Sequence, residues 1–197
     1  MAQIPKGFDY IKSVPFFLKI GAFILLFIAL ITLGVFLDKG SQDVTLTNHK
    51  KVDSFDHWGR KGGLDFGMFV IVVSWLQVIL LVVLFVTGLH EKISVINWPL
   101  TVAINMVIWG LLLFISGCVI ADTAVKYDEK KFSYSPWSFC DFLKLSWVNS
   151  DARCGHLVGS AAICIITTIV FGVDAFFNFQ LWRGKEAPSA GPAAVPT

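Results

Sequence analysis

One acidic side chain, Asp174, stands inside a long apolar stretch that runs from Leu157 to Phe179. A carboxylate inside a membrane span costs roughly 2.5–3.5 kcal/mol on insertion scales and usually faces other helices. Lys19 lies just inside a second apolar stretch, and Gln77 and Asn105 lie inside two more. These residues predict an intramembrane polar layer, in which Asp174 pairs with Lys19 or accepts a hydrogen bond from Asn105. A packing role is favoured over a proton or ion relay, because only one acid is present.

Two cysteines, Cys140 and Cys154, share one polar loop of the sequence. They predict a disulfide if that loop faces an oxidising compartment, and closing such a loop contributes about 3 kcal/mol in the chain-entropy model. The alternative is two unrelated reduced thiols. Cys140, Cys154 and His156 also offer three zinc ligands, but the sequence shows no evident fourth ligand.

Catalytic patterns are absent from the sequence. Intramembrane aspartyl proteolysis needs two facing aspartates within spans, but the four apolar stretches contain a single aspartate, Asp174. The sequence holds neither a nucleophile–base pair nor a phosphate-binding glycine loop. We therefore expect no catalytic residue, no cofactor and no metal site.

The elements that carry these residues are four apolar stretches, each long enough to cross a bilayer, which takes roughly 20 residues. The chain has 15% charged residues and a positive mean hydropathy, whereas a soluble domain has about 25% charged residues. The sequence therefore predicts an all-α membrane protein, a four-helix transmembrane bundle. The predicted spans cover residues 16–37, 66–89, 98–120 and 157–179.

The polar segments outside these spans carry weaker signals. The amphipathic residues 1–15 suit a segment lying on lipid headgroups, and a frayed tail is the alternative. Residues 185–197 are expected to form a disordered tail. Alternation in Val44–Thr47 favours a short strand or hairpin. Ser135-Pro136 is typical of a helix start, and the helical spacing of Phe139 with Phe142, Leu143 and Trp147 predicts a short amphipathic helix lying over the bundle.

Small residues recur at a spacing of four in two spans. Gly155 and Gly159 form one such motif, and Gly117 and Ala121 form another. Small residues at this spacing let two helices approach closely. Packing of the third span on the fourth is favoured over dimerisation, although the motif serves either contact.

Two signals for the orientation of the spans disagree. Basic residues are more numerous in the two long loops, which places the termini outside when counted naively. A disulfide between Cys140 and Cys154 places that loop in an oxidising compartment and the termini in the cytosol. We favour cytosolic termini. Trp98 at the start of the third span, and Trp182 with Arg183 after the fourth, are expected to anchor the membrane interface.

Two motifs resemble a known family. Asn97-Trp98-Pro99-Leu100, together with the ending Ala175–Gly184, which includes Trp182 and Arg183, is similar to the MARVEL-domain tetraspan proteins, in the branch of plasmolipin, MAL and the chemokine-like-factor relatives. The resemblance covers roughly residues 16–184. It implies cytosolic termini, no catalysis, and a role in membrane apposition, raft-associated sorting or vesicle traffic. Asp174 departs from it, since a small residue stands at the matching place in the family.

The function expected from these features is that of a non-enzymatic organiser of membrane microdomains and cargo sorting. Its expected partners are membrane lipids, including cholesterol- and sphingolipid-rich domains, other membrane proteins and a second copy of the chain, but not nucleic acid, since no block of like charges is present. Its expected location is the plasma membrane or secretory and endosomal vesicles. The alternative is a small transporter or pore that uses Gln77, Asn105 and Asp174.

Overall fold

The described part of the chain contains four long helices, as the four apolar stretches predict. The computed structural model describes residues 10–40, 43–45, 51–53, 59–92, 96–129, 138–143 and 153–184. All four long helices are apolar and long enough to cross a membrane, which confirms the predicted all-helical fold class. Their bounds are Val14–Gly40 for α2, Lys61–Val86 for α4, Trp98–Glu129 for α6 and Cys154–Trp182 for α8.

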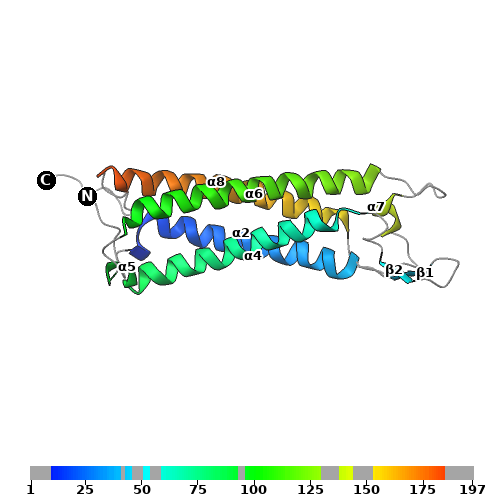
Figure 1. Ribbon diagram of the computed structural model, residues 1–197, viewed down its shortest axis with the longest axis horizontal. Helices are drawn as coiled ribbons and strands as arrows, with labels where there is room; N and C mark the ends of the chain where they lie inside the picture. The colour runs from blue at the N-terminus through cyan, green and yellow to red at the C-terminus, as the bar shows by residue number, and fades with distance from the viewer. Residues whose placement is uncertain are drawn as a thin grey trace.

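The four helices lie side by side in one elongated bundle (Figure 1). α2 packs on α4 and α8, and α6 packs on the same two neighbours, so the helices form a ring in the order α2, α4, α6, α8. The short helix α5 (Leu89–Lys92), which connects α4 to α6, lies at the end we call the α5 end. α7 (Phe139–Phe142) and the strands β1 (Asp43–Thr45) and β2 (Lys51–Asp53) lie at the opposite end, which we call the hairpin end.

Most helix ends extend beyond the predicted spans, most clearly in α6, but α4 ends at Val86, three residues before the end predicted for its span. Its apolar stretch was expected to end at residue 120, but the helix continues to Glu129. Apolarity defines where a helix crosses the bilayer, whereas backbone hydrogen bonding continues the helix into water. In this polar extension Lys126 lies 3.3 Å from Asp122 one turn earlier, a spacing that supports a helix.

The surface of the bundle is as apolar as its interior. Leu80 and Ile169 are each 63% exposed, although both lie in the middle of long helices. The interior is lined by fully buried side chains such as Leu33, Leu113 and Ile71. A helix that is hydrophobic all round suits a lipid environment, because only lipid accepts this much apolar surface.

At the hairpin end, β1 and β2 pair antiparallel with Val44 opposite Val52. The expected hairpin is therefore present, while Leu46 and Thr47 lie outside the described residues. The predicted short helix is also present as α7, but its N-cap is Ser138, whose side chain accepts a hydrogen bond from the backbone N–H of Asp141 at 3.1 Å.

Several other expectations fall on parts of the chain that the structure does not describe. These are the proposed helix start at Ser135-Pro136, the side chain of Trp147, residues 1–9 of the N-terminal segment and the tail from residue 185 onward.

Candidate functional site: a buried ion pair and a disulfide-held end

The central polar contact of the bundle joins its first long helix to its last. The Nζ atom of Lys19 in α2 donates to Oδ2 of Asp174 in α8 at 2.7 Å, and each side chain is only 2% exposed. Lys19 is five residues from the start of α2, and Asp174 is eight residues from the end of α8. At 1.5 Å per residue both groups lie roughly 8–12 Å inside their helices, toward the α5 end.

A third residue, Asn178, completes this polar layer. Its Nδ2 atom donates to Oδ1 of Asp174 at 3.1 Å and to the backbone oxygen of Asp174 at 2.8 Å. Both carboxylate oxygens of Asp174 therefore have a partner. Asn178 was missed by the sequence reasoning, although it lies four residues after Asp174, on the same face of the helix.

The other two residues proposed for the layer are not joined to it. No hydrogen bond between described residues links Gln77 or Asn105 to Asp174. Both side chains are half-buried, and the buried amide nitrogen of Gln77 has no hydrogen-bond partner within the described ranges. Of the two partners proposed for Asp174, the structure places Lys19 there and not Asn105.

Tyr10 lies beside this layer, just before α2 begins. Its side chain is 1% exposed, and its ring centroid lies 5.2 Å from that of Phe85 in α4 and 5.7 Å from that of Phe16. The hydroxyl is buried and has no hydrogen-bond partner among the described residues. Burial raises the pKa of Tyr10 well above its usual range, and the negative charge of Asp174 raises it further.

The chemistry of this arrangement is that of a neutralised ion pair. Two opposite charges in direct contact offset much of the cost of burying either one alone, provided that further hydrogen bonds are made. Asp174 accepts from Lys19 and from Asn178, so its charge is used in fixing α2 against α8. The layer therefore acts as a specific contact between helices.

The helix-packing glycines are used differently from the expectation. A Cβ atom on Gly117 in α6 would lie 3.3 Å from the backbone oxygen of Ala161 in α8, so this glycine does allow close packing of the two helices. A Cβ atom on Gly155 or Gly159 would meet no atom of the described residues within 4 Å. The expected packing of this α8 motif on α6 is therefore wrong, because its glycines point away from the bundle.

Another pair of glycines, Gly63 and Gly67 in α4, makes the close approach that sequence reasoning assigned to α8. Added Cβ atoms would lie 2.9 Å from Val119 and Ile120 of α6, respectively. The pair has the same spacing of four, so the signal was present in the sequence. Ala121 of α6 is half-buried and packs against the core.

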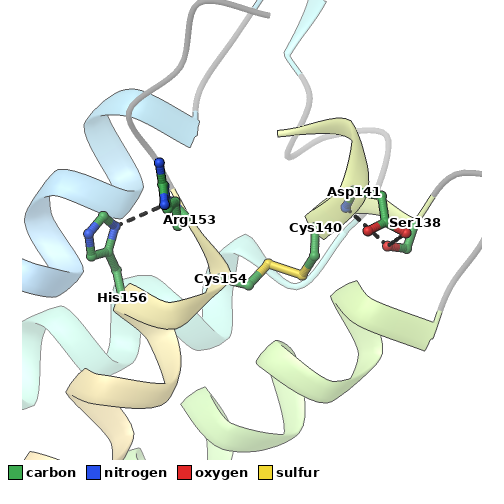
Figure 2. The surroundings of a disulfide bond; sticks show 6 residues. All are labelled: Ser138, Cys140, Asp141, Arg153, Cys154 and His156. Carbon is green, nitrogen blue, oxygen red and sulfur yellow. Dashed lines mark hydrogen bonds between the residues drawn. A yellow bond between two sulfur atoms is a disulfide. The ribbon is translucent and has the colours of Figure 1, made fainter. Parts of the chain in front are cut away.

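At the hairpin end, Cys140 of α7 and Cys154, the first residue of α8, form a disulfide with their Cα atoms 5.7 Å apart (Figure 2). The predicted pairing is confirmed, and both sulfurs are thereby removed as zinc ligands. The third proposed zinc ligand, His156, accepts a hydrogen bond at Nδ1 from the backbone N–H of Arg153 at 3.3 Å, as Figure 2 also shows.

The expected interface anchors lie at the α5 end. Trp98 begins α6, and its ring centroid lies 6.3 Å from that of Phe85. Trp182 ends α8 with its ring centroid 5.2 Å from that of Phe179, and Arg183 follows as an exposed C-cap. Aromatic rings and an arginine at helix ends suit the boundary between lipid and water.

Four apolar helices with lipid-facing surfaces and a small buried polar layer define a multi-pass membrane protein. A family model described as MARVEL, a membrane-associating domain, matches residues 10–177, which is most of the chain. The chain therefore belongs to the MARVEL family, a family of non-enzymatic membrane domains.

Among curated proteins, the chain is similar to plasmolipin from several vertebrates. It is 29% identical to plasmolipin of Mus musculus over 125 residues, which is 62% of this chain and 57% of that protein. It is 27% identical to plasmolipin of Homo sapiens over 123 residues, with the same two shares. It is 25% identical to plasmolipin of Danio rerio over 133 residues, or 68% of this chain and 62% of that protein.

These similarities mark a distant relationship to plasmolipin, because the matched region spans only about three fifths of each relative. No solved structure matches the chain.

Proposed function

We propose that this protein is a non-enzymatic membrane organiser, which gathers lipids and other membrane proteins into microdomains and takes part in vesicle traffic and membrane apposition. The observation that carries the proposal is the match to a membrane-associating domain over residues 10–177. The lipid-facing surface supports it, because large apolar side chains such as Phe69, Leu80 and Ile169 are exposed along the helices and present a wide contact area to lipid or to neighbouring spans.

The polar layer supports an organiser over a transporter or pore. A conducting path needs polar groups that face a common route through the bilayer. Here the charges of Lys19 and Asp174 pair with each other, with Nζ of Lys19 lying 2.7 Å from Oδ2 of Asp174. Gln77 and Asn105, the remaining residues of the transporter hypothesis, are only half-buried, and neither forms a hydrogen bond with this pair in the described part of the chain.

We further propose that both termini face the cytosol and that the protein resides in the plasma membrane or in secretory and endosomal vesicles. The disulfide between Cys140 and Cys154 supports this orientation, because such bonds persist in oxidising compartments. Partners proposed on the same basis are lipids of cholesterol- and sphingolipid-rich domains, other membrane proteins and a second copy of the chain.

The organiser function is tested by the distribution of the fluorescently tagged full chain in giant vesicles shed from the plasma membrane of expressing cells. After cooling separates ordered from disordered lipid, we expect enrichment in the ordered phase, and cholesterol extraction should abolish it. Exclusion of the chain from the ordered phase would contradict the microdomain role.

The alternative is tested by ion and proton flux in liposomes that contain the purified chain, beside an Asp174→Asn variant. An organiser gives no flux above protein-free liposomes. Flux that depends on Asp174 would establish the transporter alternative.

Orientation is tested separately by a membrane-impermeant thiol reagent added to intact, reduced cells. Labelling that disappears in the Cys140→Ser/Cys154→Ser variant places the hairpin end outside the cell. Labelling of the wild type that appears only after permeabilisation, and is missing from the double variant, would contradict cytosolic termini.

A further inference from the structure

Two carboxamide side chains, Gln77 in α4 and Asn105 in α6, belong to the same seam of the bundle. A Cβ atom on Gly67 of α4 would lie 3.2 Å from Oγ of Ser116, so these positions mark the sides on which the two helices face each other. Asn105 precedes Ser116 by eleven residues, or about three helical turns. Gln77 follows Gly63, which also approaches α6, by fourteen residues, or about four turns. Both amides therefore lie on the α4–α6 side of their helices.

The two amides also lie at a similar depth in the membrane. Asn105 is seven residues after Trp98, where α6 begins, and Gln77 is nine residues before Val86, where α4 ends. At 1.5 Å per residue these positions are roughly 10–14 Å from the α5 end of their helices. Because Trp98 suits the boundary between lipid and water, both amides lie within the hydrocarbon layer.

Asn105 lies at the outer edge of this seam and not in the core. Its side chain and that of Gln77 are half-buried. Ile104 and Ile108, the neighbours of Asn105 on the outer side of α6, are 53% and 51% exposed. We call Gln77 and Asn105 the amide edge, because together they place polar groups beside a surface that faces lipid.

The hydrogen-bonding capacity of the amide edge is unused in the single chain. The buried Nε2 atom of Gln77 has no hydrogen-bond partner in the described part of the chain, and the side-chain amide of Asn105 forms no hydrogen bond there either. An unpaired amide is strongly unfavourable in hydrocarbon, because lipid tails offer neither donors nor acceptors. The missing hydrogen bonds have to come from a molecule outside the single chain.

We propose that the amide edge is a contact between two copies of this chain. A carboxamide carries both donors and an acceptor. Two Asn105 side chains related by a two-fold axis can therefore each donate to the other, and the Gln77 side chains beside them supply further donors. A lipid headgroup fits less well, because headgroups lie beyond Trp98, roughly 10 Å from Asn105. This contact rests on the proposed organiser function, for which it provides an interface between copies.

The first experiment measures self-association of the purified full chain in liposomes, by energy transfer between donor-labelled and acceptor-labelled copies across a range of chain-to-lipid ratios. The wild type should associate. Asn105→Leu should raise the apparent dissociation constant about fivefold or more, because hydrogen bonds between polar side chains of neighbouring spans stabilise helix association. Asn105→Gln keeps a donor and an acceptor at this position and should stay close to the wild type.

A cross-linking experiment locates the contact between copies. Thr101, exposed one turn before Asn105 on α6, and Phe17, exposed on α2, are each replaced by cysteine in a Cys118→Ser background. Thr101→Cys should form a disulfide between two copies under mild oxidation, whereas Phe17→Cys should not. Adding Asn105→Leu to Thr101→Cys should lower the cross-linked fraction severalfold.

Two results would overturn the inference. A wild type that stays monomeric at every chain-to-lipid ratio would assign the amide edge to lipid or to a different membrane protein. Association that is unchanged by Asn105→Leu, with cross-linking at Phe17→Cys, would place the contact between copies on another face of the bundle. Neither result bears on the organiser function itself, which is tested by enrichment in ordered lipid and not by association in liposomes.

Discussion

The ammonium group of Lys19 lies 2.7 Å from the carboxylate of Asp174, in a contact that is almost completely closed to solvent. The two residues are 155 positions apart and belong to the first and the last of the four long helices. The ion pair therefore forms only when α8 has packed against α2. It closes the ring of helices at the one seam between helices that are not neighbours in the sequence.

Close packing at Gly117 gives the first prediction. A Cβ atom there would lie 3.2 Å from Ile165 and 3.3 Å from both the backbone oxygen of Ala161 and the Cβ atom of Cys164. Gly117→Leu should lower the free energy of unfolding by about 1–3 kcal/mol, because the seam between α6 and α8 cannot accept the added volume. Unfolding in mixed micelles with a denaturing detergent measures the change.

The matched control for that substitution is Gly159→Leu, which adds the same side chain to α8 at a position where a Cβ atom meets no described residue within 4 Å. Gly159→Leu should change the free energy of unfolding by no more than about 0.5 kcal/mol. Equal losses in the two variants would mean that both glycines pack against another helix, contrary to the structure.

The contact between Tyr127 and Gly59 gives the second prediction. Tyr127→Phe keeps the ring against Phe139 and removes only the hydrogen bond to the backbone oxygen of Gly59. The free energy of unfolding should fall by about 0.5–1.5 kcal/mol, the usual net contribution of such a hydrogen bond. Hydrogen exchange should rise at the start of α4 and not in α8. Unchanged hydrogen exchange around Lys61 would show that the hydroxyl of Tyr127 does not hold the start of α4.

Ionisation of Tyr10 gives the third prediction. Its pKa in the folded chain is raised above the ordinary value of 10.0, first by burial and then by Asp174. The folded state thus favours the neutral phenol of Tyr10. The stability of the fold is therefore unaffected by this group below its ordinary pKa and falls as the pH rises above that value.

We therefore expect the thermal midpoint of the wild type to fall more steeply above pH 10.0 than that of Tyr10→Phe. A series of melts across this pH range in the same micelles measures the difference. Parallel curves for the two proteins would show that the Tyr10 hydroxyl is not buried beside Asp174.

Much of this architecture was predictable because apolar length and composition decide whether a helix crosses a membrane. The four spans follow from that rule, and the pairing of Cys140 with Cys154 follows from two cysteines in one loop. The partner of Asp174 was narrowed to Lys19 or Asn105, since both fall at a similar depth.

The remaining features depend on the direction in which each helix face points. Hydrophobic periodicity does not reveal this direction when a helix is apolar all round. For this reason Gly155 and Gly159 were assigned to the interior although they face outward, and Gly63 and Gly67 were overlooked. The contribution of Asn178 likewise required knowing that Asp174 points into the bundle.

The most direct test of the ion pair between the first and last spans is a double-mutant cycle of Lys19→Met and Asp174→Asn, measured as the free energy of unfolding in mixed micelles. Each single change should cost about 3–5 kcal/mol, because removing one partner disrupts a buried pair. The double variant should lose far less than the sum of the two, giving a coupling energy of about 2 kcal/mol or more. Losses that simply add would contradict the pairing of Lys19 with Asp174.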